Sequence, residues 1–180
     1  MGANDSTIRF TSFPATKPPP PFIPDIAAVF RAHEGEIATE RIEQRLKSDE
    51  VLRLLSPGLV ELGFAVESGK TAQQIIDRPV FFGENGEPTL RFEVDAYHSE
   101  WKCGLEVEAT RAIRGGAFYR DLIQALVMVG IDHLCVAVPN RVQWGRTGKG
   151  KDYAVAVNTA HAIYGHSRIT MPYGLTVIGY

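Results

Sequence analysis

Two short segments near the middle of the chain alternate apolar and polar residues. Residues 90–95 read LRFEVD, and residues 105–109 read LEVEA. A period of two is typical of a β-strand that packs one face on a core. The residues between them, 98–104, are polar and few enough for a hairpin-like return. The pattern predicts two adjacent strands whose acidic residues lie together.

Upstream of these strands, the pattern predicts a long helix and two short strands. Residues 36–55 place apolar side chains at helical spacing among many charged ones. Ser48 is a candidate N-cap for a second helix within this stretch, and the Ser-Pro-Gly sequence that follows predicts a break. Residues 64–67 and 79–82 have the composition of strands, and GENG at 83–86 predicts a turn.

Downstream of the acidic strands, helices and strands alternate. Residues 117–129 predict a helix, and 134–138 (LCVAV) predict a strand covered on both faces. Residues 140–151 predict a basic loop, residues 153–164 a second helix and residues 175–180 a last strand. A strand, a helix and an apolar strand in succession form a βαβ pattern.

A proline-rich segment precedes all of these elements. Residues 13–24 read FPATKPPPPFIP, which excludes a regular helix or a central strand. We therefore expect an N-terminal arm over residues 1–35, a candidate contact for a protein partner, and a single α/β domain over residues 36–180.

The composition predicts a soluble cytoplasmic protein. The chain has 180 residues with 44% hydrophobic content, which suits one domain with its own core. Its apolar runs are too short to span a membrane, and its N-terminus lacks the pattern of a secretory signal. The two cysteines, Cys103 and Cys135, lack the spacing of a zinc site and are expected to be core thiols.

The charges are unevenly distributed although the net charge is only −2. Residues 1–110 hold 11 Lys and Arg against 18 Asp and Glu, whereas residues 111–180 hold 8 against 3. A phosphodiester-cleaving enzyme needs carboxylates for a metal ion and cations for the strand backbone, and this distribution suits one.

Three carboxylates, Asp95, Glu106 and Glu108, are the candidate chemistry of the two acidic strands. Acidic groups that share one patch repel each other unless a cation lies among them. Mg²⁺ takes oxygen ligands and leaves positions for water and phosphate. The alternative interpretation is the solvated face of an ordinary sheet.

The expected order of elements is helix, three strands, helix, strand, with Asp95 on the second strand and Glu106 and Glu108 on the third. This order resembles the PD-(D/E)XK nuclease superfamily, in particular the type II restriction endonuclease branch whose third motif position is Glu. The resemblance covers roughly residues 36–140. The sequence departs from the pattern in two places, because Val94 stands where Pro is usual and the motif Lys is absent, with Lys102 as a candidate substitute.

The resemblance implies a restriction endonuclease-like core, a central mixed β-sheet flanked by helices (αβββαβ). It also implies a Mg²⁺-dependent DNA endonuclease, with Mn²⁺ as an alternative metal, and such enzymes often act as homodimers. Asp95 and Glu106 would be the metal ligands, and Glu108 would position or deprotonate the attacking water. The further residues it suggests are Glu40, Glu43 and Gln124 as accessory groups and Arg111, Arg114 and Arg120 as phosphate contacts.

Three other interpretations compete with this one. The first is a catalytically inactive module of the nuclease fold that binds nucleic acid or a protein. The second is a glycosidase with an acid and base pair, which we rank low because aromatic residues make up only 9% of the chain and none cluster beside Glu106. The third is a structural domain, which leaves unexplained why the acids coincide with a nuclease-like order of elements.

Overall fold

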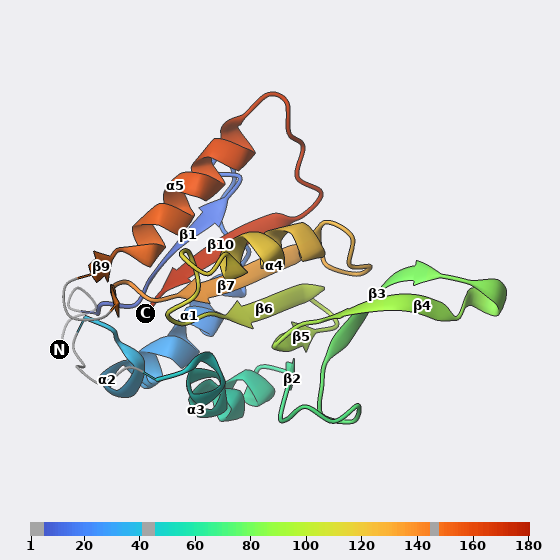
Figure 1. The fold of residues 1–180 in the computed structure, drawn as a ribbon, viewed down its shortest axis with the longest axis horizontal. Helices are drawn as coiled ribbons and strands as arrows, with labels where there is room; N and C mark the ends of the chain where they lie inside the picture. Colours follow the sequence, from blue (N-terminus) through green and yellow to red (C-terminus); the bar gives the residue numbers. More distant parts are fainter. Residues whose placement is uncertain (1–5, 41–45, 145–147) are drawn as a thin grey trace.

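A six-stranded mixed sheet forms the centre of the computed structural model, which describes residues 6–40, 46–144 and 148–180 (Figure 1). The class is α/β with helices on both faces of the sheet, as the sequence predicted. In spatial order the strands are β1 (Arg9–Phe13), β10 (Gly174–Gly179), β7 (His133–Val138), β6 (Cys103–Val107), β5 (Ala96–His98) and β2 (Ala65–Val66).

Three parallel strands, β6, β7 and β10, form the middle of this sheet. All residues of β6 and β7 are buried, which explains the continuous apolar run of β7. Helix α4 (Ala117–Ala125) connects β6 to β7, and α5 (Asp152–Gly165) precedes β10. The outer strands β1, β5 and β2 pair antiparallel to their neighbours.

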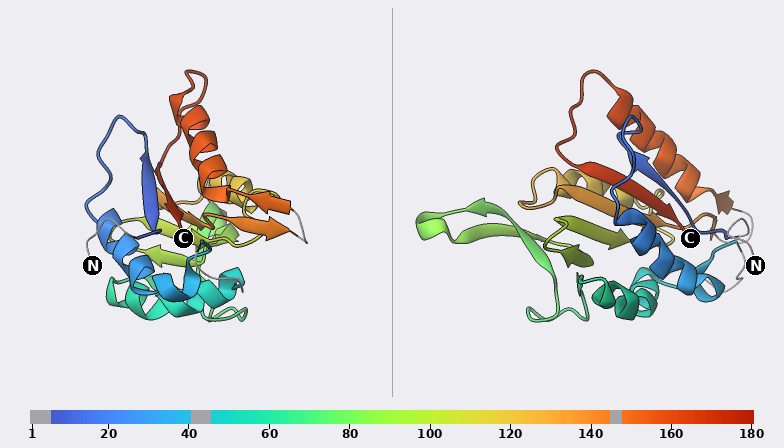
Figure 2. Two further views of the ribbon diagram at one scale, coloured as in Figure 1. Left: turned by 90° about the vertical axis from the view of Figure 1, so that its left-hand side faces the viewer. Right: turned by 180° about the vertical axis from the view of Figure 1, so that it is seen from behind.

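Helices cover both faces of the sheet, as Figure 2 shows, and an apolar cluster lies on each face. Helices α1 (Ile23–Ala32), α2 (Glu34–Ile37) and α3 (Ser48–Glu61) pack on one face, against residues such as Leu105 and Ala137. Helices α4 and α5 pack on the other face, against β7 and β10. Because neighbouring residues of a strand point to opposite faces, Glu106 belongs to the α4 side.

The predicted helix over 36–55 is wrong in its bounds. Helix α2 ends at Ile37, because the backbone turns extended at Ala38, and α3 begins at Ser48. Lys47, rather than Ser48, is the N-cap residue, and its backbone N–H donates to the Glu50 carboxylate (2.7 Å). The helix continues through Pro57 to Glu61 because Leu55 and Leu59 are fully buried on its core face.

The first 35 residues contain two elements that belong to the fold. Strand β1 pairs with β10, and α1 buries Ile23, Ile26 and Phe30 in the core. Between them, residues 14–22 form neither helix nor strand, as their prolines predict. The pattern of residues 9–13 alternates too weakly to reveal the strand, which its pairing with β10 stabilises.

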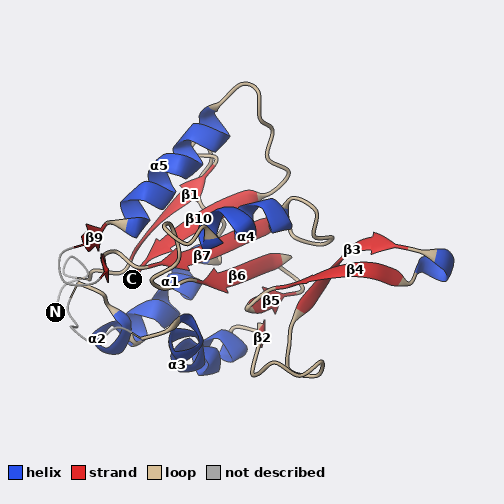
Figure 3. Cartoon of the chain, viewed as in Figure 1, coloured by secondary structure: helices blue, strands red, loops and turns tan. Residues whose placement is uncertain are grey.

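The chain segment that connects β2 to β5 forms a two-stranded hairpin that projects away from the central sheet (Figure 1). It consists of β3 (Asp77–Phe82) and β4 (Pro88–Glu93), and the predicted turn forms its tip as the 3-10 turn η1 (Glu84–Gly86), seen in Figure 3. The strand predicted over residues 90–95 therefore ends at Glu93 and pairs with β3, which corrects the predicted pairing with the second acidic strand. Asp95 lies between β4 and β5, outside both strands. The chain changes partners at Val94, whose N–H donates to the carbonyl of Ile76 (2.8 Å), and β5 then pairs with β6.

Two downstream predictions also need correction. Helix α4 ends at Ala125 instead of residue 129, because the N–H of Val129 donates to the carbonyl of Pro79 at the base of the hairpin (2.8 Å). The predicted loop over 140–151 contains a small hairpin of β8 (Val142–Trp144) and β9 (Gly148–Gly150). Among the residues that the structure describes, no helix is both long and apolar enough to cross a bilayer.

Candidate active site

Asp95 lies at the junction between the projecting hairpin and the central sheet. Its Oδ2 accepts a hydrogen bond from the backbone N–H of Val107 on β6 (2.8 Å), and its carbonyl accepts one from the N–H of Glu67 (2.8 Å). The register that pairs Ala96 with Leu105 sets Asp95 alongside Glu106. The predicted neighbourhood of these two acids is therefore present in the structure.

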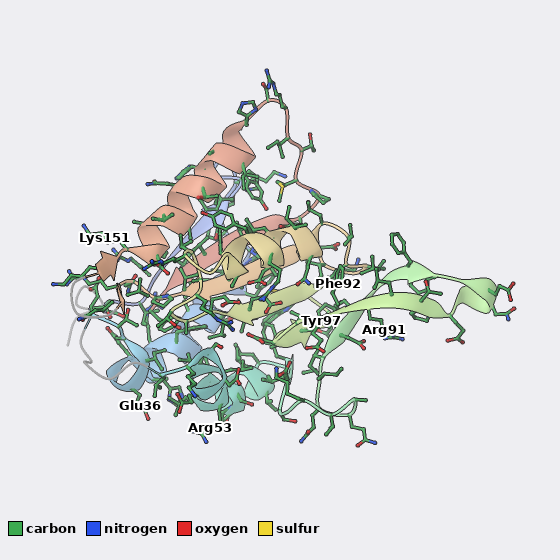
Figure 4. All side chains as sticks on the ribbon, viewed as in Figure 1. Glu36, Arg53, Arg91, Phe92, Tyr97 and Lys151 are labelled. Carbon is green, nitrogen blue, oxygen red and sulfur yellow. The ribbon has the colours of Figure 1, made fainter. Side chains whose placement is uncertain are left out.

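Asp95 and Glu106 line one cleft of about 430 Å³, between the base of the hairpin and α4. We call it the acidic cleft. In Figure 4, Arg91 and Phe92 mark its position at the hairpin base. Its charged and amide side chains are Glu67, Lys70, Arg91, Glu93, Asp95, Glu106, Arg120, Asp121 and Gln124.

Asp121 is a member of this cleft that the sequence analysis missed. It lies on the buried stripe of α4 and is only 2% exposed. Its Oδ1 pairs with Arg120 at 2.8 Å, and its Oδ2 is buried. A buried acid on an otherwise apolar helix stripe was the available signal in the sequence.

Glu108 follows β6 and lies on the same side of the sheet. Its carboxylate pairs with Arg120 (3.1 Å), so the guanidinium of Arg120 bridges Glu108 and Asp121. The backbone N–H of Glu108 donates to Ala137, and its carbonyl accepts the hydroxyl of Tyr180. These contacts fix Glu108 next to the acidic cleft, although its side chain does not line it.

Burial and mutual repulsion raise the pKa values of these acids. Desolvation raises the pKa of Asp95 to about 7 and that of Glu108 to about 8, and nearby carboxylates add to both. Desolvation also raises the pKa of Glu106 well above its usual range, and Asp95 and Asp121 raise it further. Such a group of acids holds protons near neutral pH until a cation replaces them.

Lys70 and Glu67 bring a second opposite-charge pair to the acidic cleft. Both follow β2, form an ion pair with each other and line the cleft. The hydrogen bond to Glu67 raises the pKa of Lys70. In the sequence this loop is recognisable only as a polar segment. Its approach to Asp95 depends on the pairing of strands in the sheet, so spacing along the chain gives no signal of it.

The structure brings some of the other predicted residues to the cleft and leaves others elsewhere. Gln124 and Arg120 line it. Lys102 lies at the opposite end of β6, roughly 13 Å along the strand from Glu106 at 3.3 Å per residue, and pairs with Asp132 (3.2 Å).

The remaining candidates lie outside the acidic cleft. Glu40 pairs with Arg9 (3.4 Å) and Arg141 (3.7 Å) at a separate cleft. Arg111 and Arg114 are exposed in the turn before α4, so their contact with phosphate stays a prediction. The accessory candidate Glu43 lies outside the described residues.

The carboxylate oxygens of the acidic cleft are of the type that a hard divalent cation binds. Within residues 6–40, 46–144 and 148–180, no three His, Cys, Asp or Glu side chains already converge as a metal-binding group. Mg²⁺ usually binds through one or two carboxylates plus water, so Asp95 and Glu106 provide a sufficient set. Asp121 lies beside them, and a hydrogen bond with the Glu108 carboxyl contributes to the pKa shifts of both groups.

No family model matches the chain, and no curated protein gives a significant match. The resemblance to PD-(D/E)XK nucleases therefore stays a prediction that depends on the residues and topology of this chain.

Proposed function

We propose that this chain is a Mg²⁺-dependent phosphodiesterase, a DNA endonuclease of the PD-(D/E)XK type. The observation that carries the proposal is the position of Asp95, which is hydrogen-bonded to β6 beside the buried Glu106 in an open cleft. The cleft also holds cations, Lys70 and Arg120, which suit a phosphate group.

The order of the elements supports the same proposal. Helix α3 is followed by β2, β5 and β6, which pair antiparallel in succession, then by α4 and the parallel strand β7. This order is compatible with the αβββαβ order of the nuclease core if the β3–β4 hairpin is an insertion between β2 and β5. Asp95 immediately precedes the second strand of the series, and Glu106 belongs to the third.

The chemistry follows from the positions of the side chains. A divalent cation held by Asp95 and Glu106 would lower the pKa of a water molecule and offset charge on the phosphate. Lys70 and Arg120 orient the phosphate and neutralise the negative charge that gathers on its oxygens during attack. Glu108 would position or deprotonate the attacking water, as the resemblance implies, from its place beside the cleft, where its carboxylate pairs with Arg120 (3.1 Å).

The experiment that tests the proposal is cleavage of supercoiled plasmid DNA with Mg²⁺ or Mn²⁺, compared with EDTA. We expect nicked and linear products only with the metal, and none from the Glu106→Gln variant. Glu100→Gln is the matched control, because Glu100 is an exposed carboxylate in the turn between β5 and β6. Equal cleavage with metal and with EDTA, or none in either, would refute the proposal.

An inactive module of the same fold is the second candidate. The observation that favours it is the ion-pairing of Arg120 with both Glu108 and Asp121, which already offsets part of the acidic charge. This candidate predicts binding of nucleic acid or a protein without cleavage under any metal condition. The plasmid experiment separates the two when it is combined with a binding measurement.

A further inference from the structure

A second cleft, of about 570 Å³, opens at the carboxyl end of β7. We propose that it binds consecutive backbone phosphates of a nucleic acid strand, outside the acidic cleft. This inference rests on the proposed function for its choice of nucleic acid as the ligand. We call it the basic cleft, and the side chains that the argument uses are Thr39, Glu40, Arg141, Lys149 and Lys151.

Among the described residues that line it, the basic cleft carries an excess of positive charge. Arg141, Lys149 and Lys151 line it and are exposed, and Glu40 is its carboxylate. Glu40 already pairs with Arg141 and also with Arg9, a further cation beside the cleft. The acid is therefore offset within the protein, and the two lysines supply the charge for an anionic ligand.

Lys149 and Lys151 are two residues apart, on β9 and at the N-cap position of α5. Lys149 is the middle residue of β9, and Lys151 follows the strand directly. The side chains of both lysines line the same cleft. Two point charges in a row match the repeated phosphates of a strand backbone better than they match one compact anion.

Arg9, at the rim of the basic cleft, is held in place by its neighbours. Its Nε donates to the side-chain oxygen of Asn140 (2.9 Å), and its guanidinium lies 4.7 Å from the ring centre of Tyr153. Its Nη2 pairs with Glu40. A cation that is already oriented loses little conformational entropy when a phosphate binds.

The basic cleft is joined to the candidate active site through one residue, Tyr180. The Tyr180 hydroxyl donates to the carbonyl of Glu108, and the Tyr180 carbonyl accepts the hydroxyl of Thr39 (2.7 Å). Thr39 Oγ1 in turn accepts the backbone N–H of Arg141 (3.1 Å). Both sites therefore lie at the carboxyl ends of the parallel strands, where open α/β sheets bind their ligands.

Figure 4 shows the separation of the two regions. Lys151 lies on one side of the sheet and α4, whereas Arg91, at the acidic cleft, lies on the other. Among the residues that the structure describes, the two clefts share no lining residue, so Lys149 and Lys151 would hold phosphates away from the reacting bond.

The test compares the variant Lys149→Ala/Lys151→Ala with the control Lys17→Ala/Arg168→Ala, which removes two exposed cations elsewhere. Both are made in a Glu106→Gln background, and binding of a fluorescent duplex and of its single strand is measured between about 50 and 200 mM salt. Thermal unfolding confirms that both variants are folded. Polyglutamate serves as the probe for an acidic protein partner.

We expect the lysine variant to reduce the slope of log affinity against log salt by about 2, since each lost phosphate contact removes about 0.9. The loss is the same for unrelated DNA sequences, and the control keeps the original slope. An unchanged slope in the lysine variant, or tight binding of polyglutamate and none of DNA, overturns the inference. A changed slope in a protein that never cleaves DNA supports the inference while it refutes the proposed enzyme.

Discussion

Asp95 accepts a hydrogen bond from the backbone N–H of Val107, the residue directly after Glu106 (2.8 Å). This contact joins Asp95, which lies in no strand, to the last residue of β6. The two acids therefore stay adjacent, although the chain leaves its pairing with β3 at Val94 and pairs with β6 from Ala96. The contact also leaves the other carboxylate oxygen of Asp95 available to the cleft.

Asp95→Asn should abolish catalysis while leaving the fold intact. Asparagine keeps the size and one oxygen that can accept from Val107, but it loses the charge that a divalent cation requires. We expect plasmid cleavage to fall by at least about 100-fold and the melting temperature to stay the same or rise, because a repelled buried acid is removed. A variant with full activity would show that Asp95 is not a ligand.

Without divalent cation, the protein should lose stability as the pH rises from 5 to 8. The pKa values of Asp95 and Glu108 are raised by burial to about 7 and about 8, above unfolded values near 4. The folded chain therefore binds more protons than the unfolded chain in this window, and stability falls with pH.

We expect the melting temperature to drop by at least about 3 °C across that range, since 1 kcal/mol shifts it by roughly 2–4 °C for a chain of this size. Added Mg²⁺ should reduce the drop, because it binds the charged carboxylates. Thermal unfolding at several pH values, with EDTA or Mg²⁺, measures both effects. A curve that rises with pH in EDTA would contradict the raised pKa values.

Arg120→Ala should destabilise the protein near neutral pH. The side chain bridges Glu108 and Asp121, and Asp121 is almost completely buried. Loss of the Arg120 side chain leaves these acids without a cation. We expect the free energy of unfolding, measured in urea at pH 7.5, to fall by about 1–3 kcal/mol. The cost should shrink at pH 5, where Glu108, whose pKa is raised to about 8, is protonated, and Arg168→Ala provides the control. Equal costs at both pH values would exclude an electrostatic origin.

Lys70→Ala should lower the cleavage rate, whereas Lys102→Ala should not. Lys70 lines the acidic cleft, while Lys102 pairs with Asp132 at the other end of β6. We expect a loss of about 10- to 100-fold for Lys70→Ala and partial recovery in Lys70→Arg, which keeps the charge. Single-turnover rates with saturating metal make the comparison. A reduced cleavage rate in Lys102→Ala, with a normal rate in Lys70→Ala, would show that Lys102 and not Lys70 assists cleavage.

The alternation of residues along the chain was sufficient to predict the acidic pair. A period of two fixes which side chains share a face, and the short polar segment before β6 fixes the hairpin, so Asp95 and Glu106 were predicted together. The alternation did not reveal that β4 pairs with β3 instead of joining the central sheet. A period of two shows which side chains lie on the same face of a strand, but it does not show which strand lies next to it.

Asp121 and Lys70 were missed for different reasons. Asp121 interrupts the apolar stripe of α4, and a lone acid in such a stripe is visible in the sequence. Lys70 reaches the cleft only through the pairing of β2 with β5, a tertiary contact without a local signal. The motif departure at Val94 also has a structural counterpart, since Val94 is buried at the point where the hairpin meets the sheet.

Calorimetric titration of the metal-free protein with Mn²⁺ tests the central claim most directly. The account predicts saturable binding at pH 7.5 with release of protons, because the cation replaces protons on carboxyls whose pKa values are raised. It further predicts that Glu106→Gln and Asp95→Asn lose this binding while Glu100→Gln retains it. Absence of binding to the unmodified chain, or equal binding to all four proteins, would contradict the assignment of the acidic cleft as a metal site.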